Sequence, residues 1–142
     1  MYIFLDIDGV LNTYSDFSKK PYTLNKECVD NFLQFIHKVN EPKIILTSSW
    51  RKGFEKDYNE CSPQIQKLID KGINIFDKTA ISPNKDRAAE INYYLRRHEK
   101  DDYIVIDDDI NEYKSQINNL YLTDYKKGFS KKDIIKVKKL CF

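Results

Sequence analysis

The sequence predicts an α/β fold built on a five-stranded, mostly parallel sheet with helices on both faces. Short apolar runs alternate along the chain with segments in which apolar residues recur every three or four positions. The first pattern is typical of strands buried in a parallel sheet, and the second of amphipathic helices that cover such a sheet. The chain has 142 residues, 41% of them hydrophobic, so residues 1–142 are expected to form one domain around one core.

Composition narrows the classes of protein that the sequence fits. The formal net charge is only +2, so bulk charge does not indicate a partner. Cys28, Cys61 and Cys141 are widely spaced and form neither a metal-binding pattern nor a disulfide framework, which favours a cytoplasmic protein. No signal peptide is recognisable and no apolar run approaches the ~20 residues that cross a membrane, so no membrane association is expected.

The first strand is expected at residues 2–5 and runs directly into two aspartates. Asp6 and Asp8 are two positions apart, so on an extended backbone both carboxylates project to the same side. Two close carboxylates cannot both stay ionised at low energetic cost without a cation or a proton between them. Gly9 permits a sharp turn directly after them. The end of this strand, where ligands gather in open α/β sheets, is therefore a candidate site.

A polar stretch and a helix are expected between the first two strands. Residues 11–23 contain a proline and are expected to form a loop or a short hairpin. Residues 25–40 carry the apolar periodicity of a helix, and the second strand is expected at 43–46.

Hydroxyl side chains follow the second strand. Thr47 and Ser48 stand where a hydroxyl group would donate to a bound oxyanion, although Ser and Thr at such positions also cap helices. Trp50 is expected to be packed rather than functional. Arg51 is expected either to bind a substrate phosphate with two hydrogen bonds or to remain solvated.

The middle of the chain predicts a further strand between two helices. Ser62 and Pro63 are typical of a helix start, and Gly72 of a helix end. A strand is then expected at 73–76, and the next helix at 85–98.

A basic residue stands at the expected start of the helix over 85–98. Lys85 there meets the positive end of the helix dipole, which is favourable only if an anion binds nearby. Arg87 is the alternative for the same role, and a solvated lysine is the simpler interpretation.

The fourth strand is expected at 103–106, and three consecutive acids follow it. Asp107, Asp108 and Asp109 repel one another, and an ordinary turn does not require three of them. A hard cation with oxygen ligands would remove the repulsion. Asp107 and Asp108 are the expected ligands, and Asp109 either replaces one of them or caps the following turn.

The last strand is expected at 120–122, and Ser130 is expected to cap a final helix. Lysines gather on this helix and just before it, where they would contact a nucleic-acid backbone or simply be solvated. They are Lys126, Lys127, Lys131, Lys132, Lys136, Lys138 and Lys139.

These stretches together resemble the haloacid dehalogenase-like (HAD) superfamily of phosphotransferases. Residues 6–11 match the family's first motif, Asp-x-Asp-Gly-(Val/Thr)-Leu. Thr47, with Ser48 as the alternative, stands in the place of the second motif, and Lys85, with Arg87 as the alternative, in the place of the third. The acidic run after the fourth strand resembles the fourth motif.

The resemblance implies a three-layer α/β/α Rossmann-like domain and a Mg²⁺-dependent phosphohydrolase that works through an aspartyl-phosphate. Asp6 would be the nucleophile and Asp8 the general acid and base. Thr47 and Lys85 would stabilise charge on the phosphoryl oxygens, and Ser48 and Arg51 would contact the substrate. The implied magnesium ligands are Asp6, Asp8, Asp107 and Asp108.

A narrower resemblance concerns the run Leu-Thr-Ser-Ser-Trp-Arg, the run Ile-Asp-Asp-Asp and the segment 128–130. It is to the small HAD domains of RNA-repair-associated proteins, although those have Gly-Leu-Thr where this chain has Gly-Phe-Ser. The chain leaves no room for a separate cap domain, so an open site and phosphorylated RNA or DNA ends as substrates are expected. Nucleotides and phosphoproteins are alternatives, as are a different phosphoryl acceptor than water and a non-catalytic module that binds magnesium or nucleic acid. The oligomeric state is left open.

Overall fold

The computed structural model describes residues 1–55 and 61–141, and a five-stranded sheet lies at its centre. The strands lie in the order β3-β2-β1-β4-β5, and each neighbouring pair is parallel. Because all strands run in one direction, their carboxyl ends share one edge of the sheet. The predicted parallel α/β fold is confirmed. The strands are β1 (Tyr2–Leu5), β2 (Lys43–Leu46), β3 (Ile75–Lys78), β4 (Tyr103–Asp107) and β5 (Leu120–Leu122).

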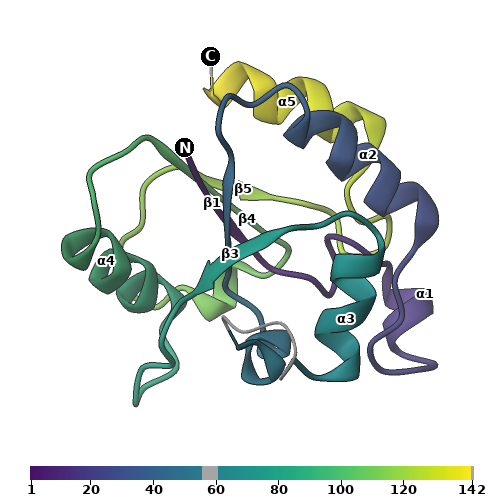
Figure 1. The fold of residues 1–142 in the computed structure, drawn as a ribbon, viewed down its shortest axis with the longest axis horizontal. Helices are drawn as coiled ribbons and strands as arrows, with labels where there is room; N and C mark the ends of the chain where they lie inside the picture. Colours follow the sequence, from purple (N-terminus) through teal and green to yellow (C-terminus); the bar gives the residue numbers. More distant parts are fainter. Residues whose placement is uncertain (56–60, 142) are drawn as a thin grey trace.

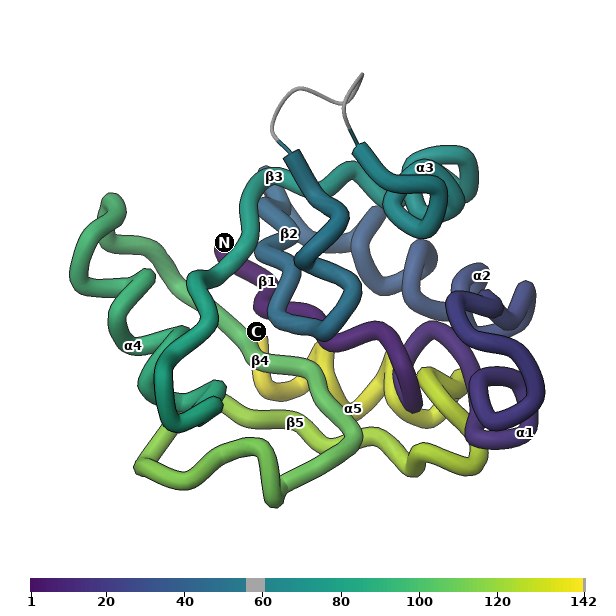
Figure 2. The backbone as a smooth tube through the Cα atoms, turned by 90° about the horizontal axis from the view of Figure 1, so that it is seen from below, coloured from purple at the N-terminus to yellow at the C-terminus, as the bar shows by residue number. Residues whose placement is uncertain are grey.

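Helices cover both faces of the sheet (Figure 1). One face carries α2 (Lys26–Ile36), α3 (Pro63–Asp70) and α5 (Lys131–Cys141), and the other carries α4 (Arg87–Arg97). Figure 2 again places α3 and α4 on opposite sides of the strands. In the described part of the chain, no helix combines the length and the apolar character needed to cross a bilayer. The shorter helical elements are α1 (Tyr14–Phe17) and the 3₁₀-helices η1 (Ser49–Gly53) and η3 (Ile110–Glu112).

Each side of the central strand packs into its own hydrophobic cluster. Ile3 and Leu5 join the cluster that includes the inner sides of α2, α3 and α5. Tyr2 and Phe4 join the second cluster, which includes Ile91 of α4. No side chain of β1 is more than 3% exposed. A strand buried on both faces has a continuous apolar sequence, which is why residues 2–5 could be recognised as one.

The helix expected at 25–40 and the strand expected at 73–76 have different bounds in the structure. The helix expected at 25–40 is shorter, because α2 ends at Ile36. The strand expected at 73–76 begins two residues later, as β3. Ile73 is fully buried but lies in the turn after α3, where its N–H donates to the carbonyl oxygen of Leu68. A short apolar run therefore marked a buried segment here without marking its conformation.

The segment between β1 and α2 contains a short helix instead of a hairpin or a plain loop. Thr13 caps α1, and the side chains of Thr13 and Asp16 form a reciprocal capping box. All residues between β1 and β2 are described, and the only helices among them are α1 and α2. No separate cap domain is inserted at this point, which leaves the carboxyl edge of β1 beside a small flap, residues 11–23, that includes α1.

Candidate active site

The turn after β1 is held tightly against the carboxyl edge of the sheet. The N–H of Asp6 donates to the carbonyl oxygen of Ile106 in β4, which ties the turn to the neighbouring strand. Gly9 has a positive φ of 83°, and a Cβ atom at this position would overlap the carboxylate of Asp108. Glycine is therefore required both for the backbone conformation and for the close approach of the second acidic turn.

Three carboxylates from the two acidic turns converge. One oxygen each from Asp6, Asp107 and Asp108 lies within 4.8 Å of the others. Asp6 is 4% exposed and Asp107 is fully buried, so water does little to screen their repulsion. The predicted convergence of the turn after β1 with the turn after β4 is therefore present. Carboxylate oxygens at this spacing are the donor set that suits a hard divalent cation such as Mg²⁺.

The surroundings of these acids disfavour their charged forms in the absence of a cation. Burial raises the pKa of Asp6 well above its ordinary value, Asp107 raises this pKa further, and the Arg87 guanidinium partly opposes the increase. Burial, partly offset by a hydrogen bond with Asp6, raises the pKa of Asp108 to about 7. A bound cation would reverse this preference, because it stabilises the carboxylate forms.

Asp107 is anchored by protein donors on both of its oxygens. Its Oδ1 accepts from the backbone N–H groups of Asp108 and Asp109, at 2.7 and 3.2 Å. Its Oδ2 accepts from Arg87 Nη1 at 2.8 Å and from the hydroxyl of Tyr113 at 2.7 Å. Asp107 therefore holds the arginine and the turn in place, while Asp108 projects beside Gly9. Asp109 caps η3 by accepting from Asn111 N, which fits its predicted capping role.

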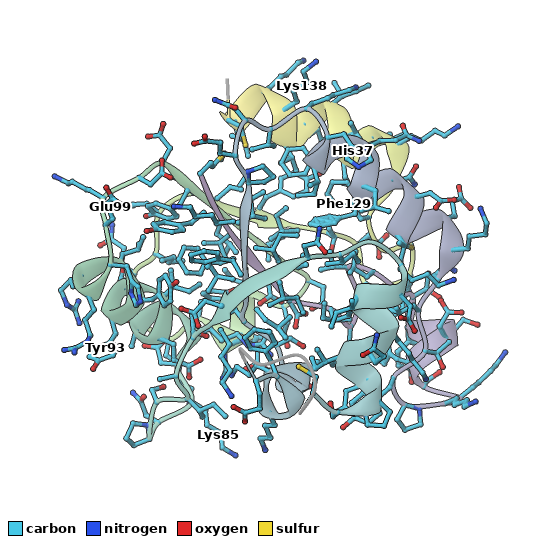
Figure 3. All side chains as sticks on the ribbon, viewed as in Figure 1. His37, Lys85, Tyr93, Glu99, Phe129 and Lys138 are labelled. Atoms are coloured by element: carbon cyan, nitrogen blue, oxygen red, sulfur yellow. The ribbon has the colours of Figure 1, made fainter. Side chains whose placement is uncertain are left out.

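Arg87, and not Lys85, brings positive charge to the acids. Arg87 Nη1 lies 3.2 Å from Asp6 Oδ1 and 2.8 Å from Asp107 Oδ2. Lys85 is exposed, and Figure 3 shows its side chain directed away from the body of the molecule. The expectation that the helix begins at Lys85 is wrong: Lys85 has a φ of 53°, Asp86 is the N-cap, and α4 begins at Arg87.

The position of the N-cap has a physical cause outside the helix. Asp86 is buried, and its carboxylate accepts from the backbone N–H groups of Ala88 and Lys114 and from the hydroxyl of Ser115. It thereby joins the start of α4 to the segment after η3, which also carries Tyr113. Sequence reasoning missed Asp86 and Tyr113, because their partners lie in a segment with no recognisable pattern.

Thr47 and Ser48 lie at the carboxyl end of β2, as expected, and both are buried. The N–H of Thr47 donates to the carbonyl oxygen of Leu5. The Thr47 hydroxyl donates to the carbonyl oxygen of Ile45 at 3.3 Å. Ser48 caps η1, because its hydroxyl oxygen accepts from Trp50 N at 3.2 Å. The capping interpretation therefore holds for Ser48, and contact of either hydroxyl with a phosphate stays a prediction.

Arg51 lies in a buried ion pair. It is 6% exposed, and its Nη2 lies 2.9 Å from Glu90 Oε1 of α4. Its Nη1 donates to the hydroxyl of Thr79 at 3.0 Å. The expectation of a solvated arginine is wrong, and its contact with a substrate phosphate stays a prediction. The ion pair connects η1 to α4, so it supports the two elements that flank the acids.

The carboxylate of Asp8 is held by partners outside the cluster of acids. Within the described residues, the group of converging carboxylates does not include it. Instead, Asp8 Oδ1 accepts from Asn12 Nδ2 at 2.9 Å and from the indole Nε1 of Trp50 at 3.2 Å. The predicted role of this carboxylate as a metal ligand is therefore not supported by the geometry, whereas a role in proton transfer is compatible with it.

Hydrogen bonds from the segment 123–129 also hold the turn after β1. The hydroxyl of Thr123 donates to the carbonyl oxygen of Gly9 at 2.8 Å, and the N–H of Phe129 donates to that of Val10 at 2.7 Å. Gly128 has a φ of 67°, and a Cβ atom there would crowd Cys28 Sγ and the turn. The segment 123–129 thus forms a clamp that holds the turn after β1 in place.

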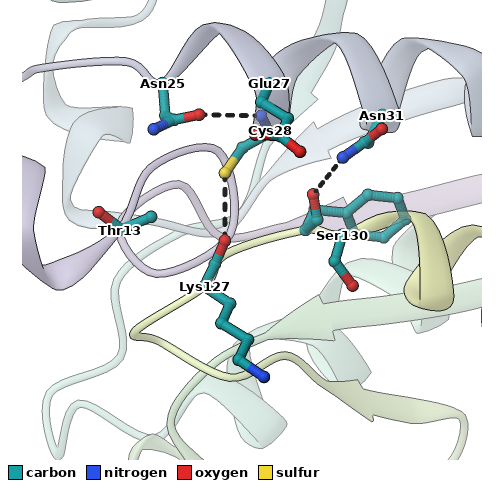
Figure 4. Close-up of a pocket in the computed structure, with 8 residues that line it drawn as sticks. Thr13, Asn25, Glu27, Cys28, Asn31, Lys127 and Ser130 are labelled. Carbon is teal, nitrogen blue, oxygen red and sulfur yellow. Dashed lines mark hydrogen bonds between the residues drawn. The ribbon is translucent and has the colours of Figure 1, made fainter.

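A pocket of about 310 Å³ lies at this clamp (Figure 4). In it, Cys28 Sγ donates to the carbonyl oxygen of Lys127 at 3.4 Å and Asn31 Nδ2 to that of Phe129 at 3.2 Å. Burial raises the pKa of Cys28 to about 11, so its thiol stays protonated at neutral pH. Both contacts hold the clamp against α2, and we assign the pocket no catalytic group.

Comparison with curated proteins and with solved structures gave no match. Comparison with protein families gave one that covers residues 2–134, described as the HAD domain in Swiss Army Knife RNA repair proteins. This match supports a HAD-type phosphohydrolase or a related function, and HAD proteins generally use Mg²⁺, for which the acidic cluster provides oxygen donors. The five-stranded parallel sheet, the two acidic turns and the matched range agree, and the chain belongs to this family of HAD domains.

Proposed function

We propose that the protein is a Mg²⁺-dependent phosphohydrolase that forms a phosphoryl intermediate on Asp6. The observation that carries this proposal is the placement of Asp6, buried at the carboxyl edge with Asp107, Asp108 and Arg87 around it. A buried carboxylate among other carboxylates is unfavourable for stability alone, so its presence favours a ligand that brings positive charge.

Asp6 and Asp108 are the residues that would hold the ion, because four donors already satisfy Asp107. When bound, Mg²⁺ would neutralise the acids together with a phosphate oxygen and so permit an anionic ester to approach. Arg87, with Thr47 or Ser48, would bind the remaining phosphoryl oxygens. An arginine suits this role because its planar guanidinium presents several donors in a fixed geometry.

The reaction has two steps, each with one proton transfer. In the first, a carboxylate oxygen of Asp6 attacks phosphorus, the bond from phosphorus to the ester oxygen breaks, and protonated Asp8 gives its proton to that oxygen. In the second, Asp8 takes a proton from water as the water oxygen attacks phosphorus, and the bond to Asp6 breaks. Alcohol and phosphate are released, and both aspartates return to their starting states.

The direct test is phosphate release from p-nitrophenyl phosphate and from oligonucleotides phosphorylated at either end. We expect release with Mg²⁺ and none with excess EDTA. Failure to hydrolyse any ester at saturating Mg²⁺ would contradict the proposal. Salt-dependent RNA binding without hydrolysis would then favour the alternative, a non-catalytic module.

We further propose that the phosphate lies at a nucleic-acid end, since the matched family is described in RNA repair proteins. An exposed aromatic surface supports this substrate. Tyr14 and Tyr125, 53% and 42% exposed, pack edge to face with ring centroids 5.8 Å apart. Lys126 Nζ lies 5.8 Å from the centroid of the Tyr125 ring. Aromatic rings stack on unpaired bases, and a neighbouring lysine attracts the backbone phosphates.

Only part of the predicted lysine cluster adjoins this aromatic surface. Lys126 and Lys127 lie in the segment that clamps the turn after β1, next to α1. Lys138 lies at the opposite end of the molecule from Lys85, as Figure 3 shows, and Lys85 follows the carboxyl end of β3. The end of α5 is therefore remote from the acids, and the two lysines before α5 are the better candidates for contact with a substrate strand.

Replacement of both Tyr14 and Tyr125 by Ala tests the nucleic-acid substrate. Loss of stacking, about 1–3 kcal/mol per base, should raise KM for a phosphorylated oligonucleotide at least fivefold and leave p-nitrophenyl phosphate hydrolysis unchanged. Tyr93→Ala is the matched control, because Tyr93 is 47% exposed but lies on α4. Equal effects of the double variant on both substrates would contradict this part of the proposal.

A further inference from the structure

The indole of Trp50 makes a contact that sequence reasoning did not anticipate. Its Nε1 donates to Asp8 Oδ1 at 3.2 Å, although Trp50 is fully buried. The cap at Ser48 fixes its backbone, and the ring of Tyr22 packs edge-on against the indole with centroids 5.3 Å apart. The indole is thus held in place by its own element and by the flap.

A second donor reaches the same carboxylate oxygen. Asn12 Nδ2 lies 2.9 Å from Asp8 Oδ1 and also donates to the carbonyl oxygen of Thr23 at 2.7 Å. The orientation of the amide is fixed, because Asn12 Oδ1 accepts from the backbone N–H of Gly9 at 2.8 Å, and an N–H can only donate. Asn12 therefore presents its NH₂ group to Asp8.

These two contacts make the oxygens of Asp8 unequal. Oδ1 faces two N–H donors, which occupy its two lone pairs and offer no acceptor for a proton. Among the residues that the structure describes, none forms a hydrogen bond with Oδ2. A proton carried by Asp8 can therefore reside only on Oδ2 while both contacts persist.

We propose that Trp50 is a positioning residue which, with Asn12, confines the transferable proton of Asp8 to Oδ2. This inference rests on the proposed function, in which Asp8 protonates the leaving oxygen. Trp50 does not contact the reacting atoms; it determines which oxygen of the carboxyl group delivers the proton and prevents the group from rotating. The flap contributes through Tyr22, which packs on the indole.

The hydrogen bond between Trp50 and Asp8 could also serve only to stabilise the fold. A buried indole N–H requires an acceptor, so Asp8 would also serve stability alone. The two roles differ in their dependence on the leaving group. Proton delivery matters for an alkyl phosphate, whose leaving oxygen is strongly basic, and hardly matters for dinitrophenyl phosphate, which departs as a stable anion.

The experiment uses the single tryptophan of the chain. Global replacement of tryptophan by benzothienylalanine exchanges the indole N–H for sulfur at position 50 only, with nearly unchanged shape. Since kcat/KM reports on the steps up to transfer to Asp6, it is measured for an alkyl phosphate and for dinitrophenyl phosphate. General acid catalysis contributes about 10²–10⁴-fold, so we expect a loss of at least tenfold for the alkyl ester and less than about twofold for the dinitrophenyl ester.

Trp50→Phe is the second variant, because it removes the N–H and keeps an aromatic ring, and thermal melting of both variants monitors folding. The alkyl ester should again suffer the larger loss. Equal losses for the two esters, or no loss for either, would overturn the positioning role while leaving the proposed function intact. A wild-type protein that hydrolyses neither ester would refute the proposed function itself, and the inference with it.

Discussion

The turns after β1 and β4 carry the same residue type but surround it differently. In each turn, protein donors fix one aspartate: Asn12 and Trp50 hold Asp8, and four donors hold Asp107. Asp6 in the first turn and Asp108 in the second lie in the same cluster as Asp107, but each has few donors and a raised pKa. The hydrogen-bond donors around a carboxylate, and not its place in a motif, thus separate an anchored acid from one available to a ligand.

The largest expected effect is that of removing the nucleophile. Asp6→Asn keeps the shape of the side chain but not its charge, and should lower phosphate release on the order of 10³-fold or more. Asp109→Asn is the matched control, since asparagine also caps helices, and should retain nearly full activity. Both variants are measured in phosphate-release assays at saturating Mg²⁺. An active Asp6→Asn enzyme would contradict the assignment of Asp6 as the nucleophile.

The next largest effect concerns Arg87, whose guanidinium joins the two acidic turns. Arg87 contacts Asp6 and Asp107 with Nη1, and its Nε lies 3.9 Å from Glu112 Oε2, so we expect Nη2 to contact a phosphate. Arg87→Lys should lower kcat/KM by about tenfold or more, because an ammonium group cannot reproduce a planar array of donors. Lys85→Ala should change it less than about twofold, since a solvated lysine contributes little. A larger loss of kcat/KM for Lys85→Ala than for Arg87→Lys would instead assign the phosphate-binding role to Lys85.

Magnesium titrations of activity would sharpen the contrast within the turn after β4. Asp108→Asn should raise the Mg²⁺ concentration for half-maximal activity by at least about tenfold, as expected for a lost ligand. Asp107→Asn should mainly lower kcat, because Asp107 positions Arg87 and Tyr113. If Asp107→Asn gave the larger shift in Mg²⁺ requirement, the assignment of anchored and available acids would be reversed.

The smallest expected effect is on stability. The folded protein binds the protons of Asp6 and Asp108 more tightly than the unfolded chain does, since both pKa values are raised on folding. The metal-free protein should therefore lose stability as the pH rises from 3.8, the ordinary pKa, to about 7, the folded pKa of Asp108. Melting in EDTA should show Tm lower at pH ~7.5 than at pH ~5.5, by a few degrees, and Mg²⁺ should raise Tm more at the higher pH. A Tm that increased with pH in EDTA would contradict the raised pKa values.

Much of this architecture was predictable because it depends on local patterns. Continuous apolar runs marked the strands buried on both faces, and the acids at two strand ends implied their meeting at one edge. Asp6, Asp107 and Asp108 could be placed together without a structure for that reason, although the same argument also included Asp8, which the cluster does not contain.

The contacts that distinguish the residues within the site were not predictable. Arg87 rather than Lys85 reaches the acids because Asp86 is held by Lys114 and Ser115, which are far along the chain. In the same way, Arg51 finds Glu90 on another element. Such long-range pairs leave no periodic signal, whereas a buried polar residue between elements is visible once the fold is known.

The central claim is that Asp6 receives the phosphoryl group, and trapping that group tests it most directly. An acid-quenched reaction treated with borohydride converts a phosphorylated aspartate into homoserine, which peptide mass spectrometry locates. We expect homoserine at position 6, dependent on both substrate and Mg²⁺. Phosphate release with homoserine at another aspartate, or at none, would contradict the account.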